Sequence, residues 1–397
     1  MPPFTSRKSA YSREAVMSLT KREHTLGIWA LGLGYFVFYT PYSGLIKAVT
    51  SGLLSGGNRV SGFALLPSTI ISTAIAIPIF ITAMGWWKYA RVRKAGGITI
   101  PSPSWQTVLS GLCFATIIAT TTLAYTFKGV SIIFALLLMR GGILIMAPLI
   151  DRAFQRRVRW FSWTGLILSM AALIIAFFDV REYQLTLLAV VNLAAYLTGY
   201  ALRLPCMTQI AKTRDENMSL CYFVEEQMVA MPTLVLVPAI FALIGRGAMA
   251  NDLRFGFTHL LSSSFALYGL AIGLCYAGLG IFCTFIFLDR RENTFCVPMH
   301  SCSSLLAGIV ASYALTWWLH APTPSGAQMG GVLLIITALL IMSPLHHLPL
   351  YIKQIKNAVA ERRLVVFNFI RNDAGDFERP RSFITVDLQA VRRVLGK

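Results

Sequence analysis

Ten apolar stretches, each about as long as a membrane-spanning helix, follow one another along this chain and are separated by short polar loops. A helix rises about 1.5 Å per residue, so about twenty residues cross a hydrocarbon core of about 30 Å. The alternating ten-residue segments of an outer-membrane barrel are missing from the sequence. The pattern predicts an all-α polytopic membrane protein with ten transmembrane helices. The predicted spans are residues 26–46, 62–86, 105–127, 130–150, 160–178, 185–202, 220–244, 264–288, 294–319 and 329–350.

Lys and Arg concentrate in the leader, in every second loop and in the C-terminal tail. Basic residues close to span ends stay on the cytoplasmic side, so both termini are expected in the cytoplasm. Loops beside anionic lipid headgroups also explain the net charge of +18, and no nucleic-acid partner is expected. The second and fourth loops carry Lys88, Arg91, Arg93, Lys94, Arg152, Arg156, Arg157 and Arg159.

The ten spans divide into two halves of five. A basic leader, residues 1–25, precedes the first half, residues 26–178; the second half, residues 185–350, is followed by a basic tail, residues 351–397. Because five is odd, the second half must cross the membrane in the opposite orientation. Spans three and four are joined by a very short connection, and so are spans eight and nine. The sequence therefore predicts two inverted five-helix repeats.

The N-terminal segment and the cysteines bear on location and cofactors. No cleavable signal peptide is recognised in the polar first 24 residues, so the first span is expected to act as the insertion signal. The expected location is a bacterial inner (plasma) membrane, with a eukaryotic endomembrane as the alternative. The seven cysteines lie in or beside spans without metal-binding spacing, so we predict neither a metal nor another cofactor.

Residues 129–151 combine a short turn, small and apolar residues and a late proline, Pro148, and Trp160 opens the next span after a basic loop. With the ten-span plan, this segment resembles the fourth span of the drug/metabolite transporter superfamily, which includes EamA-like exporters and nucleotide-sugar carriers. The resemblance covers about residues 26–351. Asp151 stands where the family often has a glutamate. The resemblance implies a transporter in which two inverted repeats enclose a central cavity.

Arg140 lies near the middle of the fourth predicted span. A guanidinium there costs about 2.5–3.5 kcal/mol on insertion scales, so something must compensate its charge. One interpretation makes Arg140 the anchor for an anionic substrate group, because its planar fork binds carboxylate or phosphate with two hydrogen bonds. The other pairs it with a buried acid or with carbonyls at a helix break.

Five further residues are predicted to line the substrate cavity with Arg140. Their spacing places polar aromatic side chains on one face of spans one and six, and His300 lies at a depth similar to that of Arg140 in span nine. Interfacial or purely packing roles are the alternatives. The predicted lining residues are Tyr39, Asn192, Tyr196, His300 and Ser301.

Glu225 and Glu226 lie near the start of span seven and point about 100° apart. We expect one to face inward, either as partner of Arg140 or as a site for a coupled proton, while the other reaches the cytoplasmic interface. If the span begins later, both are interfacial. His300 is an alternative proton carrier.

The sequence as a whole favours a secondary active transporter of a small anionic or zwitterionic metabolite that works by alternating access. The alternatives are a polyspecific drug or amino-acid exporter and a flippase for lipid headgroups. Because no catalytic motif is found, we do not expect an enzyme. Membrane lipids are expected partners. Gly269 and Gly273 have the spacing for close helix contact, either within the bundle or in a homodimer.

Overall fold

The structure is a computed structural model that describes residues 28–54, 59–95, 98–126, 132–178, 186–210, 216–260, 263, 265–320, 326–342, 363–366 and 384–387. The predicted basic leader lies outside the described residues, as does most of the predicted tail. Each of the ten predicted spans is occupied by a long helix. These helices are α2 (Ile28–Thr50), α3 (Gly62–Ala83), α4 (Trp105–Ala124), α5 (Ile132–Ala153), α6 (Trp160–Phe178), α7 (Leu187–Ile210), α8 (Glu216–Ile244), α10 (Phe265–Phe287), α11 (Asn293–Leu319) and α12 (Gly326–Met342).

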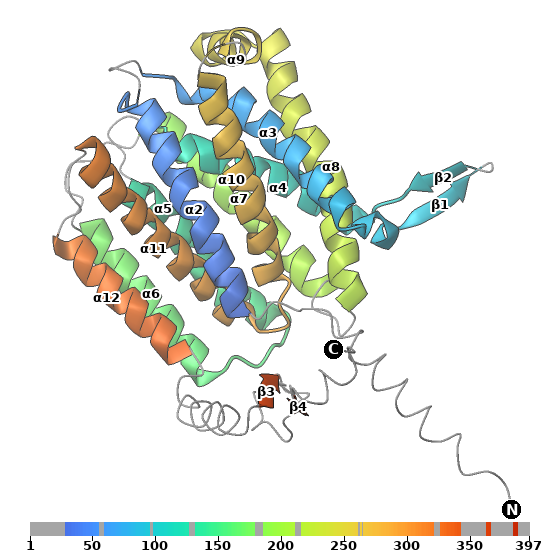
Figure 1. The fold of residues 1–397 in the computed structure, drawn as a ribbon, viewed down its shortest axis with the longest axis vertical. Helices are drawn as coiled ribbons and strands as arrows, with labels where there is room; N and C mark the ends of the chain where they lie inside the picture. Colours follow the sequence, from blue (N-terminus) through green and yellow to red (C-terminus); the bar gives the residue numbers. More distant parts are fainter. Residues whose placement is uncertain are drawn as a thin grey trace, which may run out of the picture.

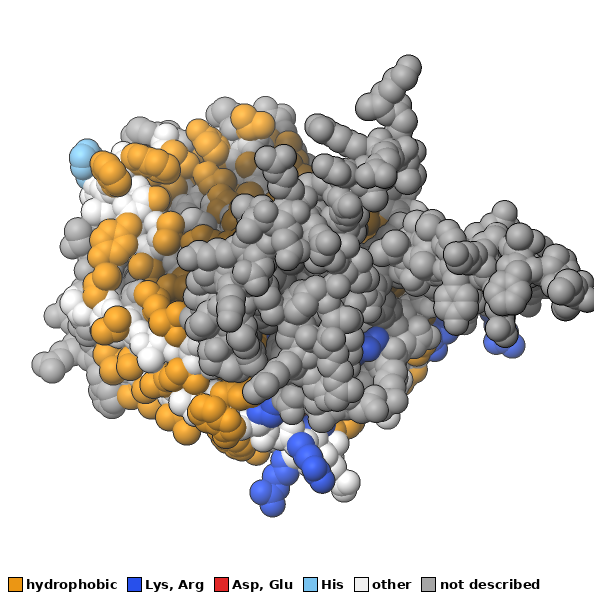
Figure 2. Space-filling view, turned by 60° about the horizontal axis from the view of Figure 1, so that its bottom comes forward, with side chains coloured by type: hydrophobic (Ala, Val, Ile, Leu, Met, Phe, Trp, Pro, Cys, Tyr) orange, Lys and Arg blue, Asp and Glu red, His pale blue; other side chains and the backbone are white. Residues whose placement is uncertain are grey.

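The helical bundle has the surface of a membrane protein. Within the described residues, six helices are long and apolar enough to cross a membrane, namely α3, α4, α7, α8, α10 and α11. Hydrophobic side chains cover much of the described surface in Figure 2, with Lys and Arg gathered near its lower edge. Trp105 and Trp160 are exposed at the start of α4 and α6, and Trp317 is exposed near the end of α11, as in an interfacial aromatic belt. The predicted class, an all-α membrane protein, is thus confirmed.

The helices pack in a regular scheme. Helix α2 lies against α10 and α11, and α7 lies against α4 and α5. Helix α3 packs on α10, α8 packs on α4, and α6 and α12 pair at one edge of the bundle (Figure 1). Gly273 permits the close contact of α10 with α3, because a Cβ there would lie 2.3 Å from the Thr69 carbonyl oxygen. One interior region is therefore surrounded by α2, α4, α5, α7, α10 and α11.

Four features of the structure were not predicted from the sequence. A short helix, α9 (Ala248–Thr258), lies across one end of the bundle (Figure 1). Strands β1 (Val92–Ala95) and β2 (Ile98–Pro101) form an antiparallel hairpin in which Arg93 pairs with Ile100. A one-turn 3₁₀ helix, η1 (Trp86–Tyr89), precedes this hairpin. In the described part of the tail, β3 (Arg363–Val366) and β4 (Ile384–Asp387) form another hairpin.

Helices α7 and α8 are longer than the predicted spans. Helix α7 continues past the predicted end at residue 202 to Ile210 and contains Pro205, and α8 begins at Glu216 rather than at residue 220. The predicted span 185–202 ends directly before Arg203, because a charge commonly marks the end of an apolar stretch. In the structure Arg203 lies inside a helix, and Glu226 lies ten residues into α8, about 15 Å along its axis.

Candidate functional site

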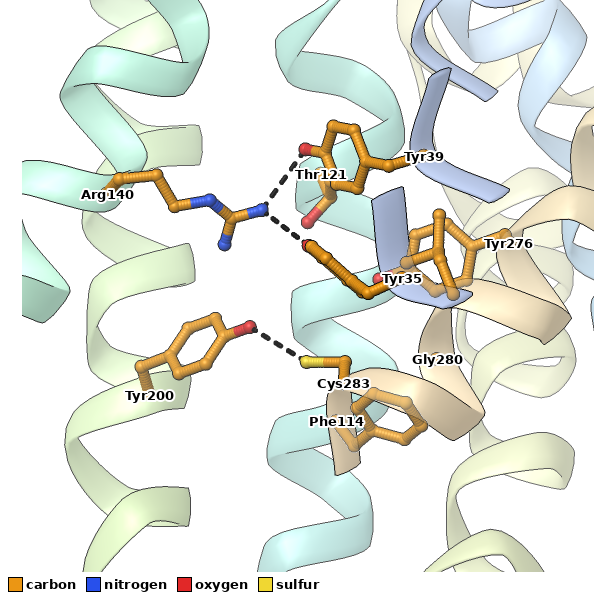
Figure 3. Close-up of a pocket in the computed structure, with 10 residues that line it drawn as sticks. Tyr35, Tyr39, Phe114, Thr121, Arg140, Tyr200, Tyr276, Gly280 and Cys283 are labelled. Atoms are coloured by element: carbon orange, nitrogen blue, oxygen red, sulfur yellow. Dashed lines mark hydrogen bonds between the residues drawn. The ribbon is translucent and has the colours of Figure 1, made fainter. Parts of the chain in front are cut away.

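Arg140 is held in the interior by four hydroxyl groups. Its side chain comes from α5, and the residue is 2% exposed. Its Nε donates to Ser304 Oγ on α11 at 3.0 Å, and its Nη1 donates to the Tyr196 hydroxyl on α7 at 2.6 Å. Its Nη2 donates to the Tyr35 and Tyr39 hydroxyls on α2 at 2.9 and 3.1 Å (Figure 3). Four helices thus meet at one guanidinium.

The charge of Arg140 has no carboxylate partner among the described residues: all four acceptors are hydroxyl oxygens. The Tyr39 ring also lies 5.6 Å from the guanidinium carbon. Hydroxyl dipoles and an aromatic face stabilise a buried cation less than an anion does. Among the described residues, the guanidinium is paired with neither of the alternative partners, a buried acid or the carbonyls of a helix break. The guanidinium charge is thus not neutralised by any described carboxylate.

A small cavity lies beside this guanidinium. Its volume is about 10 Å³, which is room for about one water molecule. The site is thus closed, and a metabolite enters only if helices move apart. Figure 3 shows its wall, which is rich in aromatic side chains. The lining residues are Tyr35, Tyr39, Phe114, Thr121, Arg140, Tyr200, Tyr276, Leu279, Gly280 and Cys283.

The tyrosines of α2 form a continuous buried row. Tyr35, Tyr39 and Tyr42 are spaced by four and three residues, so they lie on one face of the helix. The Tyr39 hydroxyl is hydrogen-bonded to that of Tyr125, and the Tyr42 hydroxyl lies 3.1 Å from Thr122 Oγ1. These contacts join α2 to α4 and its C-terminal turn, and they close one side of the site.

His300 and Ser301 are both fully buried on α11. The His300 ring lies 4.6 Å from the Tyr35 ring, and its Nε2 is 3.3 Å from Cys283 Sγ. The structure therefore places His300 beside the site. Within the described residues, His300 Nδ1 and Ser301 Oγ have no hydrogen-bond partner. The hydroxyl that contacts Arg140 belongs to Ser304, one helical turn beyond Ser301.

Asn192 connects two helices next to the site. It lies on α7, one turn before Tyr196, and its amide nitrogen donates to the Thr120 carbonyl oxygen of α4 at 2.9 Å. It is not among the residues that line the cavity. The other predicted lining residues of α2 and α7, Tyr39 and Tyr196, both contact Arg140 directly.

Glu226 pairs with a second buried arginine, Arg203, and not with Arg140. Its two carboxylate oxygens accept from Arg203 Nε and Nη2, both at 2.8 Å, and both side chains are almost completely buried. Ser110 Oγ donates to the same carboxylate at 2.5 Å. Arg203 Nη2 also donates to Thr284 Oγ1 at 2.9 Å. The pair links α7, α8, α4 and α10.

Glu225 points elsewhere, as expected for adjacent residues of a helix. It forms an ion pair with Arg91 at 3.0 Å, and Arg91 is partly exposed. It also accepts hydrogen bonds from the backbone nitrogens of Arg91 and Ser104 and from Thr107 Oγ1. Glu225 therefore ties α8 to the hairpin and to the start of α4. Both glutamates lie within α8, which begins earlier than the sequence suggested, and the alternative that both are interfacial stays untested. Their coupling role stays a prediction.

Asp151 and Glu292 connect the α5–α6 loop to the start of α11. The Asp151 carboxylate accepts hydrogen bonds from the backbone nitrogens of Asn293 and Thr294 at 3.0 and 2.6 Å, as an anion at a helix N-terminus does. Glu292 is held by both Nε and Nη2 of Arg159. Burial raises the pKa of Glu292, but hydrogen bonds from Arg159 and Ser162 outweigh it, so the pKa lies below its usual value.

Several site residues were missed by the sequence interpretation. Tyr35 carries a signal, because it continues the spacing of Tyr39 on the same helix face. Ser304 belongs to the same run of small polar residues as Ser301, but Ser304, and not the predicted Ser301, contacts Arg140. Phe114 and Cys283 have no signal that separates them from ordinary packing residues. Arg203 has the clearest missed signal, because it is a charged residue directly after the predicted span 185–202.

Comparisons with known proteins inform the fold. No family model matches this chain, and no curated protein matches it. Among the solved structures, a crystal structure of a protein matches with a TM-score of 0.53 and 12% sequence identity, and the match covers 79% of this chain and 96% of that chain. At this identity the likeness shows a shared fold alone. The helical bundle is thus an architecture that also exists in a solved protein.

Proposed function

We propose that this protein is a secondary transporter that moves a small anionic or zwitterionic metabolite across a membrane by alternating access, with Arg140 as the anchor for the anionic group. The observation that carries the proposal is the buried Arg140 guanidinium, which has four hydroxyl partners and no carboxylate among the described residues. An ionisable residue in the interior of a membrane bundle marks a substrate or ion path by default.

The groups around Arg140 suit an incoming anion. A guanidinium binds a carboxylate or phosphate with two parallel hydrogen bonds. The hydroxyls of Tyr35, Tyr39, Tyr196 and Ser304 accept from Arg140 in the closed site. Ser304 Oγ already donates to the Ser301 carbonyl oxygen and Tyr39 is bonded to Tyr125, so the hydroxyls of Tyr35 and Tyr196 are the ones that can donate to an anion oxygen. The aromatic wall offers flat apolar faces to the rest of the substrate.

The packing scheme supports ten spans in two inverted repeats. Exchanging α2 with α7, α3 with α8, α4 with α10 and α5 with α11 turns the contact of α2 with α10 into that of α7 with α4. The same exchange turns the α3–α10 contact into the α8–α4 contact. In transporters with inverted repeats the substrate binds near the membrane midplane, between the repeats. Arg140 and its partners come from both halves. With the basic loops on the cytoplasmic side, both termini are cytoplasmic.

Contacts on both sides of Arg140 support alternating access. Tyr39, which contacts Arg140, also joins α2 to Tyr125 at the C-terminal turn of α4, while Asp151 and Glu292 hold the end of the bundle where α5 ends and α11 begins. We propose that these two sets of contacts open in turn. The cavity of about 10 Å³ then corresponds to a closed intermediate between the two open states.

Uptake by proteoliposomes tests this function. The full chain is reconstituted, and a panel of anionic, zwitterionic and cationic metabolites is compared between wild type, Arg140→Gln and Arg140→Lys. Loss of a charge-assisted anchor costs about 2–5 kcal/mol, so Arg140→Gln is expected to weaken transport of the anion at least about 30-fold. Arg140→Lys keeps the charge but loses the planar fork and is expected to be intermediate.

The matched control is Arg152→Gln, which changes an exposed arginine of the same helix. It is expected to transport as wild type does. Equal uptake by wild type and Arg140→Gln would remove the proposed anchor. Preferential uptake of cations would remove the proposed substrate class.

A further inference from the structure

Arg203 carries a second buried guanidinium, which is displaced from Arg140 along the direction of α7. It lies seven residues after Tyr196 on α7, about 10 Å further along the helix towards the α7–α8 loop. The Phe114 ring lies 4.2 Å from the Arg203 guanidinium carbon, and the same ring lines the cavity beside Arg140. Phe114 thus contacts both the cavity and the second arginine.

Two buried polar atoms around Arg203 are left without partners. Within the described residues, no hydrogen bond is made by Arg203 Nη1 or by Gln227 Oε1. Buried polar atoms are nearly always satisfied, so the unpartnered guanidinium nitrogen calls for an acceptor. Gln227 Oε1 is itself an acceptor and does not bear on anion binding. The unpartnered Nη1 is a donor and sits on a permanent cation, so an anion oxygen suits it.

The Glu226 carboxylate occupies the binding fork of Arg203 in the way that a ligand would. Nε and Nη2 of Arg203 each hold one carboxylate oxygen at 2.8 Å. This is the two-bond geometry with which arginine binds carboxylate or phosphate ligands. Ser110 and Tyr222 complete a polar site around the pair, and they are hydrogen-bonded to each other.

We propose that Arg203 is a second anion site on the transport path, occupied by the Glu226 carboxylate in the closed state and by a carboxylate or phosphate group of the substrate once Glu226 withdraws. The proposal rests on the proposed function, because it makes Arg203 the next binding site for an anion that leaves Arg140. The Phe114 ring separates the two binding sites. Glu226 acts as an internal counter-ion that neutralises Arg203 while no substrate anion is bound there.

Inorganic phosphate is the probe for this site, because it is the smallest ligand of the proposed class. Thermal unfolding of the detergent-solubilised full chain is followed as phosphate is added, and the apparent dissociation constant is taken from the stabilisation. Glu226→Gln removes the internal counter-ion and leaves Arg203 charged. We expect its phosphate dissociation constant to be at least about tenfold lower than that of wild type, which equals about 1.4 kcal/mol.

Glu225→Gln is the matched control. It changes the adjacent glutamate, equally buried and also paired with an arginine, and is expected to bind phosphate as wild type does. In Arg203→Gln with Glu226→Gln, both charges of the pair are removed, and the gain in affinity is expected to vanish. If Glu226→Gln binds phosphate no more tightly than Glu225→Gln or this double variant, Arg203 is not an anion site.

Two further variants cover the remaining outcomes. If Glu226→Gln does not fold, Glu226→Asp keeps the charge but shortens the side chain. It is then expected to bind phosphate more tightly than wild type, and unchanged binding overturns the proposal. Arg140→Gln combined with Glu226→Gln is expected to keep the Arg203 site, whereas Arg140→Gln alone loses phosphate binding. If Arg140→Gln alone binds as wild type does, the proposed anchor fails while the Arg203 site is still tested by Glu226→Gln.

Discussion

Arg140 and Arg203 are both buried guanidiniums inside one helical bundle, yet their surroundings differ in one respect. Arg203 is neutralised by the carboxylate of Glu226, whereas Arg140 has only hydroxyl partners among the described residues. Both have an aromatic ring over the guanidinium, from Phe114 or Tyr39. The contrast teaches that burial alone does not mark a binding site. The difference is whether the protein supplies its own counter-ion: an anion at Arg203 has to displace the Glu226 carboxylate, whereas an anion at Arg140 displaces only hydroxyl groups.

The largest expected effect concerns stability. Arg203→Gln leaves the Glu226 carboxylate buried and unpaired, so we expect a loss of about 3–5 kcal/mol. Arg140→Gln removes four hydrogen bonds but leaves no buried charge unpaired, so its loss of stability is expected to be clearly smaller than that of Arg203→Gln. Thermal unfolding of the purified variants in the same detergent measures both. If Arg140→Gln is destabilised as strongly as Arg203→Gln, then Arg140 is a structural residue and the contrast fails.

A double-mutant cycle sharpens this difference. Combining Arg203→Gln with Glu226→Gln removes both charges, so we expect the double variant to recover up to about 3 kcal/mol relative to the sum of the single variants. Combining Arg140→Gln with Glu226→Gln is expected to be nearly additive, because these residues make no contact in the structure. A coupling energy near zero for Arg203 and Glu226 would show that the pair is not a unit.

The hydroxyls around Arg140 are tested by a matched pair on α2. The Tyr35 hydroxyl accepts a hydrogen bond from Arg140, whereas the Tyr42 hydroxyl, two turns away, is bonded to Thr122. Tyr35→Phe is expected to weaken anion binding by about 1.5–3 kcal/mol, the usual worth of a hydrogen bond to a charged group. Tyr42→Phe is expected to leave the Kd within about threefold of wild type. Equal effects of the two changes would mean that Tyr35 acts through packing.

The contrast between the two arginines also shows which features of the site can be predicted from the sequence. Arg140 stands in the middle of an apolar stretch, so both its burial and the need for a partner follow from its position. Arg203 stands near the end of a stretch and before Pro205, where a charge is ordinarily interfacial. Its pairing with Glu226 depends on how α7 and α8 meet, which no local pattern records. The positions of the long helices followed from hydropathy, but α9 and the β1–β2 hairpin lie in polar loops without that signal.

The smallest expected effect concerns a third ion pair, Glu292 with Arg159, which lies at the bundle end and is less buried than Arg203 with Glu226. The pKa of Glu292 is lowered in the folded protein, so its stabilisation is present above the unfolded value of about 4.3 and is lost as the pH falls through the folded value. Glu292→Gln is thus expected to be less stable than wild type near pH 7, by about 1 kcal/mol or less, and equally stable in acid. Thermal unfolding of both proteins between pH 7 and pH 3 measures the difference.

Added salt is expected to reduce the effect of Glu292→Gln but not that of Arg203→Gln, because only the Arg159–Glu292 pair is accessible to screening. Equal salt sensitivity would mean that solvent reaches both ion pairs. The Arg203–Glu226 pair would then not differ from the Arg159–Glu292 pair in its access to solvent.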